Sequence, residues 1–429
     1  MKVLLKGLQL IHPEQGINKI SDILLEDGVI VKIGEVTKDD LKKAKVYDFE
    51  GKYCAPGFFD MHVHLREPGR EDEETVVTGS NSAAAGGFTG IACMPNTSPA
   101  IDSAEVISLI KKKAENHLVD VYPIAAATLD RKGESLAPIS ELAEAGAVAV
   151  SDDGVAIKSA AMLRSVLEYC QMYDLPVIEH CEDETLADGA MNESEVSTQL
   201  GLPGVPTIAE DLTVARDIIV AEYIGGRVHI AHISSKKAVD LVRQAKKAGL
   251  PITAEATPHH FSLADDMIKT FDTNYKMNPP LRTREDVDAI IEGLKDGTID
   301  CIASDHAPHA SEEKEVEFVY APNGILGLET QVGLALSELY HKKQLSLEQL
   351  VEKLSINPRK ILRLEVPKFE VGEKANFTIF DPDEIWTVDI NKFKSKSKNS
   401  PFHQRLLTGK AVAVVNNSKI FYQDEFSTL

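Results

Sequence analysis

The feature that most constrains the fold of this chain is a regular alternation of two patterns between about residues 56 and 360. Short apolar or β-branched runs alternate with amphipathic helical stretches, several of which begin near Ser or Thr and end near Gly. Strands that alternate with helices indicate parallel βαβ units, and eight of them favour a closed barrel over an open sheet. The expected strands are residues 58–64, 88–94, 119–127, 147–151, 175–180, 227–232, 251–255 and 299–304.

The two ends of the chain have a different pattern. Residues 1–55 contain strand-like runs with a hairpin signal at Asp27-Gly28, and residues 365–429 contain others with a turn signal at Asn416-Asn417-Ser418. Neither end is long enough to bury a core alone, so we expect one small β-sandwich beside a barrel of residues 56–364. The sequence therefore predicts an α/β fold, a (β/α)8 TIM barrel with a small β-sandwich formed by both chain ends. Within the second end, the basic and polar residues 392–402 are expected to form an exposed loop.

Composition argues against several kinds of partner. The chain has 67 Asp and Glu against 46 Lys and Arg, a net charge of -21 that repels nucleic-acid phosphates and anionic lipid. The N-terminus has no signal-peptide pattern, and no stretch approaches the roughly 20 apolar residues that a membrane span needs. The five cysteines are widely spaced without a CxxC pair, which favours buried free thiols. We expect a cytoplasmic protein that acts on a small molecule.

The first expected strand ends in two histidines that are two residues apart. Because alternate side chains of a strand point to the same face, His62 and His64 can bind one cation together. Catalytic groups of such barrels gather at the carboxyl ends of the strands, and imidazole and carboxylate ligands suit zinc. Each polar residue at a strand end could alone be a hydrogen-bonded structural group, but their convergence favours a site for two metal ions that share a carboxylate. The other strand ends carry Asp152-Asp153, His180, His232 and Asp305.

The remaining histidines near the strand ends are expected to have other roles. His229 and His232 lie three residues apart on one strand, so only one can enter the barrel mouth, and we choose His232. His259 and His260 follow the seventh strand and are expected to lie in a turn behind the ligands. The same expectation holds for His306, next to Asp305.

Seven motifs occur together in one order: PGFFDMHVHLREPG, MPNTSP, SDDGV, EHCED, TPHH, KMNPPLR and SDHAPH. In order and spacing they resemble the type I branch of the dihydroorotases, within the metal-dependent amidohydrolase superfamily, over about residues 50 to 365. The resemblance implies the reversible cyclisation of N-carbamoyl-L-aspartate to L-dihydroorotate with loss of water, the third step of pyrimidine biosynthesis. It also implies a homodimer and leaves association with aspartate transcarbamoylase open.

The resemblance implies a role for each matching residue of the metal site. His62 and His64 would hold the more buried of two zinc ions, and His180 and His232 the second. Asp153 would bridge them, where many amidohydrolases use a carbamylated lysine. Asp305 would bind the first metal and act as general base and general acid in the reaction.

A second group of matching residues would bind the substrate. Arg66 offers a planar donor fork that matches a carboxylate, although a surface ion pair with Glu67 or Asp72 is the alternative. The asparagines beside prolines could instead shape turns. The stretch after Asp305 is expected to form a partly mobile lid, and Asn323-Gly324 stands where the family commonly has Phe-Gly, so only a backbone contact is expected there. The implied substrate-binding residues are His64, Arg66, Asn96, Asn278, His309, Asn323 and Gly324.

Two other functions remain open at this point. An allantoinase or hydantoinase-type cyclic amidase would share the fold, but such enzymes generally use the lysine bridge and lack the arginine of HLREPG. An inactive structural partner of aspartate transcarbamoylase would typically have lost metal ligands, whereas all six are present in this chain.

Overall fold

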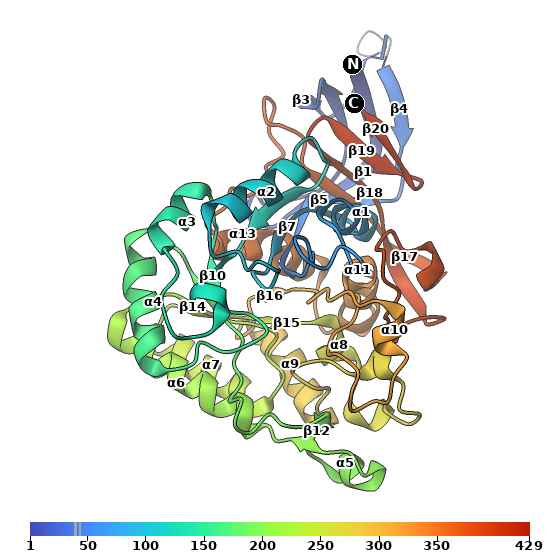
Figure 1. The fold of residues 1–429 in the computed structure, drawn as a ribbon. Coiled ribbons are helices and arrows are strands. Elements are labelled where there is room, and N and C mark those ends of the chain that lie inside the picture. The colour runs from blue at the N-terminus through green and yellow to red at the C-terminus, as the bar shows by residue number, and fades with distance from the viewer. Residues whose placement is uncertain (38–40, 43) are drawn as a thin grey trace.

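A computed structural model, which describes residues 1–37, 41–42 and 44–429, shows a barrel of parallel strands beside a second sheet (Figure 1). A bridge between Val63 and His306 joins the first barrel strand to the end of the last, which closes the barrel. Each strand range expected from the sequence overlaps a barrel strand, so the predicted barrel is confirmed. The strands are β6 (Phe58–Val63), β7 (Phe88–Cys93), β8 (Asp120–Pro123) with its continuation β9 (Ala125–Ala126), β10 (Val150–Ser151), β11 (Val177–Glu179), β14 (Val228–Ile230), β15 (Ile252–Ala256) and β16 (Cys301–Ile302).

The helices that cover the barrel begin and end at the residues that the sequence marks. The first begins after Thr75, whose hydroxyl accepts the amide N–H of Thr78, and ends at Gly87 with a φ of 99°, where a glycine costs nothing. Thr283 and Asp286 form a capping box on another. The longer helices are α1 (Val76–Gly86), α2 (Ala104–Ala114), α3 (Ile139–Ala145), α4 (Ala160–Met172), α6 (Ile208–Ile224), α7 (Lys236–Lys247), α9 (Arg284–Asp296) and α11 (Leu328–Ala335).

Shorter elements extend the loops at the ends of the barrel. A two-stranded pair and a short helix reach out from the barrel between β11 and α6, and a one-turn helix follows β16. These elements are β12 (Met191–Asn192), α5 (Glu195–Leu200), β13 (Gly204–Val205), α8 (Pro258–Ser262), α10 (Ser311–Lys314), α12 (Leu347–Val351) and α13 (Asn357–Ile361).

Both ends of the chain build the second sheet, as predicted. Its nine strands run in the order β20-β19-β18-β17-β5-β1-β2-β3, with β4 also paired to β1. The antiparallel pairing of Phe377 with Pro56 joins the two ends of the chain, and Leu8, Phe49 and Phe377 meet in one buried core. The strands are β1 (Lys2–His12), β2 (Ile17–Glu26), β3 (Val29–Ile33), β4 (Ala44–Asp48), β5 (Tyr53–Pro56), β17 (Phe377–Thr387), β18 (Leu406–Asn416), β19 (Lys419–Tyr422) and β20 (Glu425–Thr428).

The prediction of an exposed loop over residues 392–402 was wrong. The side chains alternate between solvent and protein, so that Ser395, Ser397 and Asn399 are only 2%, 5% and 5% exposed. Lysines occupy the alternate positions, of which Lys396 is exposed. The prediction rested on the basic composition of the segment. Composition does not show which side chains of an extended segment point inward, so the two-residue period was missed.

The barrel is filled by apolar side chains, such as Phe59, Met61 and Ile178. The carboxyl ends of the strands are where such a barrel holds its functional residues. All five cysteines are buried and free, which confirms that prediction. Among the described residues, no helix has both the length and the apolar character to cross a membrane.

Candidate metal and substrate site

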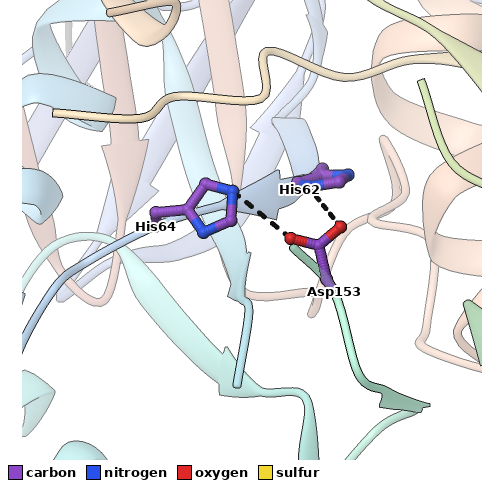
Figure 2. Close-up of side chains that lie close together, drawn as sticks. All are labelled: His62, His64 and Asp153. Carbon is purple, nitrogen blue, oxygen red and sulfur yellow. Dashed lines mark ion pairs between the residues drawn. The ribbon is translucent and has the colours of Figure 1, made fainter. Parts of the chain in front are cut away.

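The six polar residues that the sequence singles out at the strand ends lie together in one buried cluster. On one side, His62 and His64 at the end of β6 face the carboxylate that follows β10 (Figure 2). The Asp153 carboxylate oxygens lie 3.4 Å from Nε2 of His62 and 3.5 Å from Nε2 of His64. The pairing of β6 with β7 shifts register between Asp60 and Val63, and such irregularities commonly occur where a strand presents residues to an active site.

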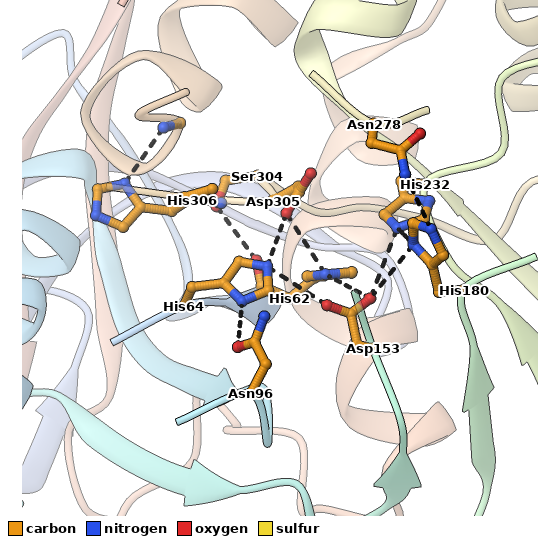
Figure 3. Close-up of polar contacts among 12 residues, drawn as sticks. His62, His64, Asn96, Asp153, His180, His232, Asn278, Ser304, Asp305 and His306 are labelled. Atoms are coloured by element: carbon orange, nitrogen blue, oxygen red, sulfur yellow. Dashed lines mark hydrogen bonds and ion pairs between the residues drawn. The ribbon is translucent and has the colours of Figure 1, made fainter. Parts of the chain in front are cut away.

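A second pair of imidazoles lies on the other side of the same carboxylate. Oδ1 of Asp153 is 3.8 Å from Nδ1 of His180 and 3.6 Å from Nε2 of His232, and these two ring nitrogens are 2.9 Å apart (Figure 3). The carboxylate thus stands between two histidine pairs that come from opposite parts of the barrel. Both histidines follow the ends of their strands, β11 and β14.

Asp305 follows β16 and lies on the side of the first pair. Its Oδ1 is 3.0 Å from Nε2 of His64 and 3.5 Å from Nε2 of His62. The backbone there has a φ of 47°, and His232 has a φ of 29°. Non-glycine residues rarely adopt this left-handed region, and such strain concentrates where the surrounding structure holds a functional residue in place.

The donor set of the cluster fits two metal ions. The groups His62-His64-Asp153 and Asp153-His180-His232 each place three ligand atoms within 4.8 Å of one another. Among the described residues, Nε2 of His62 and Oδ1 of Asp153 are buried without a hydrogen-bond partner. Buried polar atoms are normally satisfied, so atoms left in this state that point into the cluster mark a place for a cation.

The electrostatics of the cluster agree with this interpretation. Burial lowers the pKa of His62, but the charges of Asp153 and Glu255 outweigh burial and raise it well above its usual value. Burial likewise raises the pKa of Asp153, and the surrounding imidazoles more than reverse this effect. Carboxylates that favour a positive charge at this position will favour a metal ion there in the same way.

Sequence reasoning missed the residue that orients His62. Glu255 near the end of β15 lies with Oε1 2.6 Å from Nδ1 of His62 and with Oε2 3.2 Å from Nε2 of His229. A carboxylate at Nδ1 fixes the tautomer and leaves Nε2 facing the cluster. The sequence could have indicated Glu255, because it stands at the end of an expected strand, as the proposed metal ligands do. His229 contacts Thr253 and the second oxygen of the Glu255 carboxylate.

The other neighbouring histidines contact the backbone or groups behind the cluster. His260 bonds to the Thr257 hydroxyl at 2.8 Å and to the Pro279 carbonyl at 3.0 Å. His306 lies 3.4 Å from a Glu74 oxygen and accepts the Gly327 amide N–H. Burial lowers the pKa of His259 to about 4, which keeps this imidazole neutral.

Above the cluster lies a cavity of about 210 Å³, and all the residues expected to bind substrate line it. A larger hollow of about 580 Å³ lies elsewhere, between α2 and turns of the sandwich. Among the described residues, that hollow contains no group of three potential metal ligands, so volume alone does not identify the site. The smaller cavity is lined by His64, Arg66, Asn96, Asp153, Gly154, His180, His232, Asn278, Asp305, Ala307, His309, Asn323 and Gly324.

Arg66 is held from behind by a buried carboxylate. Its Nε donates to the Pro308 carbonyl at 3.1 Å and lies 3.1 Å from Glu73 Oε2. Glu73 Oε1 also lies 3.1 Å from Nδ1 of His309, so one carboxylate places a guanidinium and an imidazole at the same wall of the cavity. Arg66 therefore pairs with Glu73, in place of the surface ion pair with Glu67 or Asp72 that was the alternative.

The two asparagines face imidazoles of the cluster instead of their own turns. Oδ1 of Asn96 lies 2.8 Å from Nδ1 of His64. Nδ2 of Asn278 donates to Glu182 Oε2 at 2.9 Å and lies 3.3 Å from Nε2 of His180. Each amide thus connects the cavity wall to one half of the cluster (Figure 3).

The segment after Asp305 completes the wall. The backbone carbonyl of Asn323 lies 2.8 Å from Nε2 of His309, whereas the Asn323 side chain is exposed. Gly324 has a φ of 125°, and a Cβ there would lie 2.5 Å from the Cβ of Ala307, so the position requires glycine.

Comparison with known proteins gives a consistent result over the whole chain. Residues 51–238 match the family described as dihydro-orotase-like. The chain is 49% identical to the dihydroorotase of Acetivibrio thermocellus, with 99% of each chain covered, and 48% identical to that of Syntrophus aciditrophicus, with 99% of this chain and all of the relative covered. Among solved structures, it is similar to the L-hydantoinase (dihydropyrimidinase) of Arthrobacter aurescens, at 26% identity and a TM-score of 0.86, with 100% and 97% of the two chains covered. The dihydropyrimidinase of Brevibacillus agri, at 22% identity, a TM-score of 0.86 and coverage of 100% and 96%, shares the fold.

Proposed function

The chain belongs to the dihydroorotase family, and on that premise we propose how its residues catalyse the reversible cyclisation of N-carbamoyl-L-aspartate to L-dihydroorotate in pyrimidine biosynthesis. The observation that carries the proposal is the cavity in which Arg66 and His309 face a buried cluster of histidines and aspartates. The cluster supplies hydrolytic chemistry, and Arg66 selects a ring that bears a carboxylate.

Zinc is the proposed metal, because the donors are neutral imidazoles and carboxylates. His62, His64 and Asp305 would hold one ion and His180 and His232 the other, with Asp153 shared between them. When bound, the metal lowers the pKa of water and polarises the amide carbonyl of the ring. The two unpartnered atoms, Nε2 of His62 and Oδ1 of Asp153, support this assignment.

Asp305 is the proposed proton carrier. Burial raises the pKa of its carboxyl, but the hydrogen bond with His64 and the charges of the imidazoles bring it far below its usual value, so the group is ionised at neutral pH and carries no proton before the reaction. In ring opening it takes a proton from the attacking water and delivers it to the ring nitrogen as the C–N bond breaks. In cyclisation it takes the proton from the ureido nitrogen and returns it to the departing oxygen.

The cavity wall would bind and orient the substrate. The Arg66 guanidinium would offer N–H groups to the substrate carboxylate, and His309 would stand beside it in the same wall. Asn96, Asn278 and backbone groups of Asn323 and Gly324 would fix the rest of the ring. In a chain of net charge -21, the Arg66 guanidinium gives the cavity a cationic group for an anionic substrate.

We further propose a homodimer in the cytoplasm that is able to associate with aspartate transcarbamoylase. Exposed apolar side chains on the neighbouring helices α4 and α6 support an interface on that face. Tyr169 and Met172 on α4 are 48% and 70% exposed, and Ile219 and Tyr223 on α6 are 65% and 76% exposed. The mass of the purified protein in solution, alone and mixed with the transcarbamoylase, tests both statements.

A hydantoinase-type activity is the competing function, because the solved structures that resemble the chain include such enzymes. Two features of the site argue against it. An aspartate stands at the position between the two histidine pairs, and an arginine faces the cavity although hydantoin carries no carboxylate. The assembled cluster likewise argues against an inactive structural partner.

The test is ring opening of L-dihydroorotate, followed as loss of ultraviolet absorbance, with hydantoin and allantoin as comparison substrates. We expect turnover that is abolished by a chelator, restored by zinc, and much faster for dihydroorotate than for the other rings. Hydrolysis of hydantoin or allantoin in place of dihydroorotate by the zinc-loaded protein would contradict the proposed substrate. Turnover that survives complete metal removal would contradict the proposed site.

A further inference from the structure

A segment of the C-terminal part of the chain packs against the loops that carry the cavity wall. Residues 393–400, which we call the strap, connect β17 to β18 of the sandwich and run along the barrel. Ser395, Ser397, Asn399 and Ser400 are all buried. An extended segment with no strand pairing of its own and an inward-facing polar row must satisfy those polar groups against the barrel.

The first half of the strap is anchored to helices and loops behind the cavity. The amide N–H groups of Lys394 and Ser395 donate to Oε1 of Glu329 at 2.8 and 3.1 Å. Ser397 donates to the backbone carbonyl of Glu73 at 2.7 Å, and Ser395 donates to Glu74. These contacts fix the path of the strap before it reaches the cavity.

The second half of the strap ends at Asn399, which contacts the cavity wall directly. Its Nδ2 donates to the carbonyls of Ala307 at 2.9 Å and of Gly324 at 3.1 Å, and its Oδ1 accepts the amide N–H of His309 at 3.1 Å. Its own carbonyl accepts the amide N–H of Leu326 at 2.9 Å. One side chain therefore joins both arms of the segment that follows Asp305.

The partners of this amide match the donors and the acceptor of a carboxamide at position 399. Two carbonyl oxygens require donors and one amide N–H requires an acceptor, and a short carboxamide is the side chain that offers both from one carbon. All three partner residues line the substrate cavity. Asn399 touches neither the metal donors nor the cavity itself, since the residues that line the cavity do not include it.

We propose that Asn399 is a positioning residue for substrate binding, through which the C-terminal strap holds His309 and the Asn323-Gly324 backbone against the substrate carboxylate. The inference rests on the proposed function of the cavity. It assigns part of the substrate site to a segment that belongs, by sequence, to the sandwich. The wall then depends on the sandwich, whereas the metal cluster depends on the barrel strands.

The test compares Asn399→Ala and Asn399→Asp with Lys394→Ala. The Lys394 ammonium lies 3.3 Å from the exposed carboxylate of Asp424, so this control removes a side chain from the same strap without touching the wall. For each zinc-loaded protein we would measure kcat and KM in both directions, bound metal, and amide hydrogen exchange of a peptide that spans residues 305–326.

In Asn399→Ala we expect KM to rise about 10-fold or more in both directions, with kcat changed less and metal content unchanged, because buried hydrogen bonds to the wall are lost while the cluster is intact. Exchange of the 305–326 peptide should quicken. In Asn399→Asp a carboxylate oxygen faces two carbonyl oxygens, so KM should be higher than in the wild type. The ratio of the two KM values should fall as the pH is lowered, because the protonated carboxyl can again donate a hydrogen bond. Lys394→Ala should behave as the wild type.

The outcomes separate this inference from the proposed function. If the wild type fails to open dihydroorotate, the proposed function fails. If the wild type is active and Asn399→Ala keeps its KM and its exchange pattern, the inference about Asn399 fails. A parallel loss of kcat and metal in Asn399→Ala, or a KM excess in Asn399→Asp that does not change with pH, would assign the residue a general structural role and overturn the inference.

Discussion

The metal cluster and the substrate wall share one cavity but are built in different ways. The cluster residues lie at or just after the ends of barrel strands, whose backbones are held by neighbouring strands; they are His62, His64, Asp153, His180 and His232. The wall comes from the segment after Asp305. Asn399 holds its backbone carbonyls and one backbone amide, and Glu73 holds the imidazole of His309. A change in the cluster should therefore abolish chemistry, whereas a change in the wall should weaken binding.

The largest effect is expected for Asp153→Ala. This change removes the carboxylate that faces all four imidazoles, which would leave them without a shared ligand or a compensating charge. We expect kcat to fall by about 1,000-fold or more, since the rate then lacks the contribution of the metal site. Metal analysis after dialysis should show that at least one ion is lost.

Asp152→Asn is the matched control for that change. The Asp152 side chain is buried beside Asp153, but it accepts N–H groups of Ala127 and Thr128 and so supports the backbone instead of the cluster. It should retain metal and most of its activity, with at most a lower melting temperature. Loss of metal in this control to the same extent as in Asp153→Ala would assign the shared ligand to the wrong aspartate.

A smaller effect of a different kind is expected for Arg66→Lys. Lysine keeps the charge but loses the two-pronged geometry, and the loss of a charge-assisted hydrogen bond corresponds to roughly a 10- to 150-fold rise in KM. Metal content and the chelator sensitivity of the residual activity should not change. A fall in kcat with an unaltered KM would show that the wall takes part in the chemistry, and that the wall and the cluster do not differ in this respect.

The sequence predicts the cluster better than the wall for a physical reason. His62 and His64 are two residues apart at a strand end, so their side chains point to the same face of the strand. Because the carboxyl ends of parallel strands lie at one edge of the sheet, the residues at the other strand ends are their neighbours. Choosing Asp153 over Asp152 needed the resemblance to the family, since two adjacent residues differ only in which way they point. Glu255 could have been found by the same reasoning, because it lies at a strand end like the ligands.

The wall could not be predicted in this way. Asn399 bonds to Ala307, which is 92 positions away, and to Gly324, which is 75 positions away, and no local pattern connects them. The strap itself was predicted as an exposed loop, because its lysines dominate its composition while its serines make the buried contacts. Contacts between distant loops depend on the assembled fold, and a single sequence contains no period or spacing that reports them.

Glu255→Gln probes how the cluster is supported from behind. The carboxylate lies 2.6 Å from Nδ1 of His62, and residues in such positions typically contribute 10- to 100-fold in metal affinity. We expect weaker binding of one metal ion, measured by competition with a chelator, and activity that returns when zinc is supplied in excess. If the affinity for the metal is unchanged, the barrel strand alone orients His62. The cluster would then need no side chain from elsewhere to hold it, in contrast to the wall, which depends on Glu73 and Asn399.

The smallest effect on turnover is expected for Glu329→Gln, which tests the anchor of the strap through its pH dependence. Burial raises the pKa of the Glu329 carboxyl from 4.5 to about 7, although hydrogen bonds from Ser395, Ser82 and Lys394 oppose the rise. A raised pKa means that the folded protein binds the proton more tightly than the unfolded chain does. The stability that this proton contributes is fully present below about pH 4.5 and is lost as the pH rises through about 7.

The glutamine variant should therefore gain stability relative to the wild type as the pH rises across this window. The shift from 4.5 to about 7 corresponds to at most about 3 kcal/mol. Glutamine keeps the carbonyl oxygen that accepts the strap amides and the Ser82 hydroxyl, so kcat and KM should stay close to those of the wild type. Melting temperatures of both proteins measured from pH 5 to 8 test the sign. A difference that stays constant with pH would show that Glu329 is ionised throughout, and that the strap is held by an anion instead of a neutral acid.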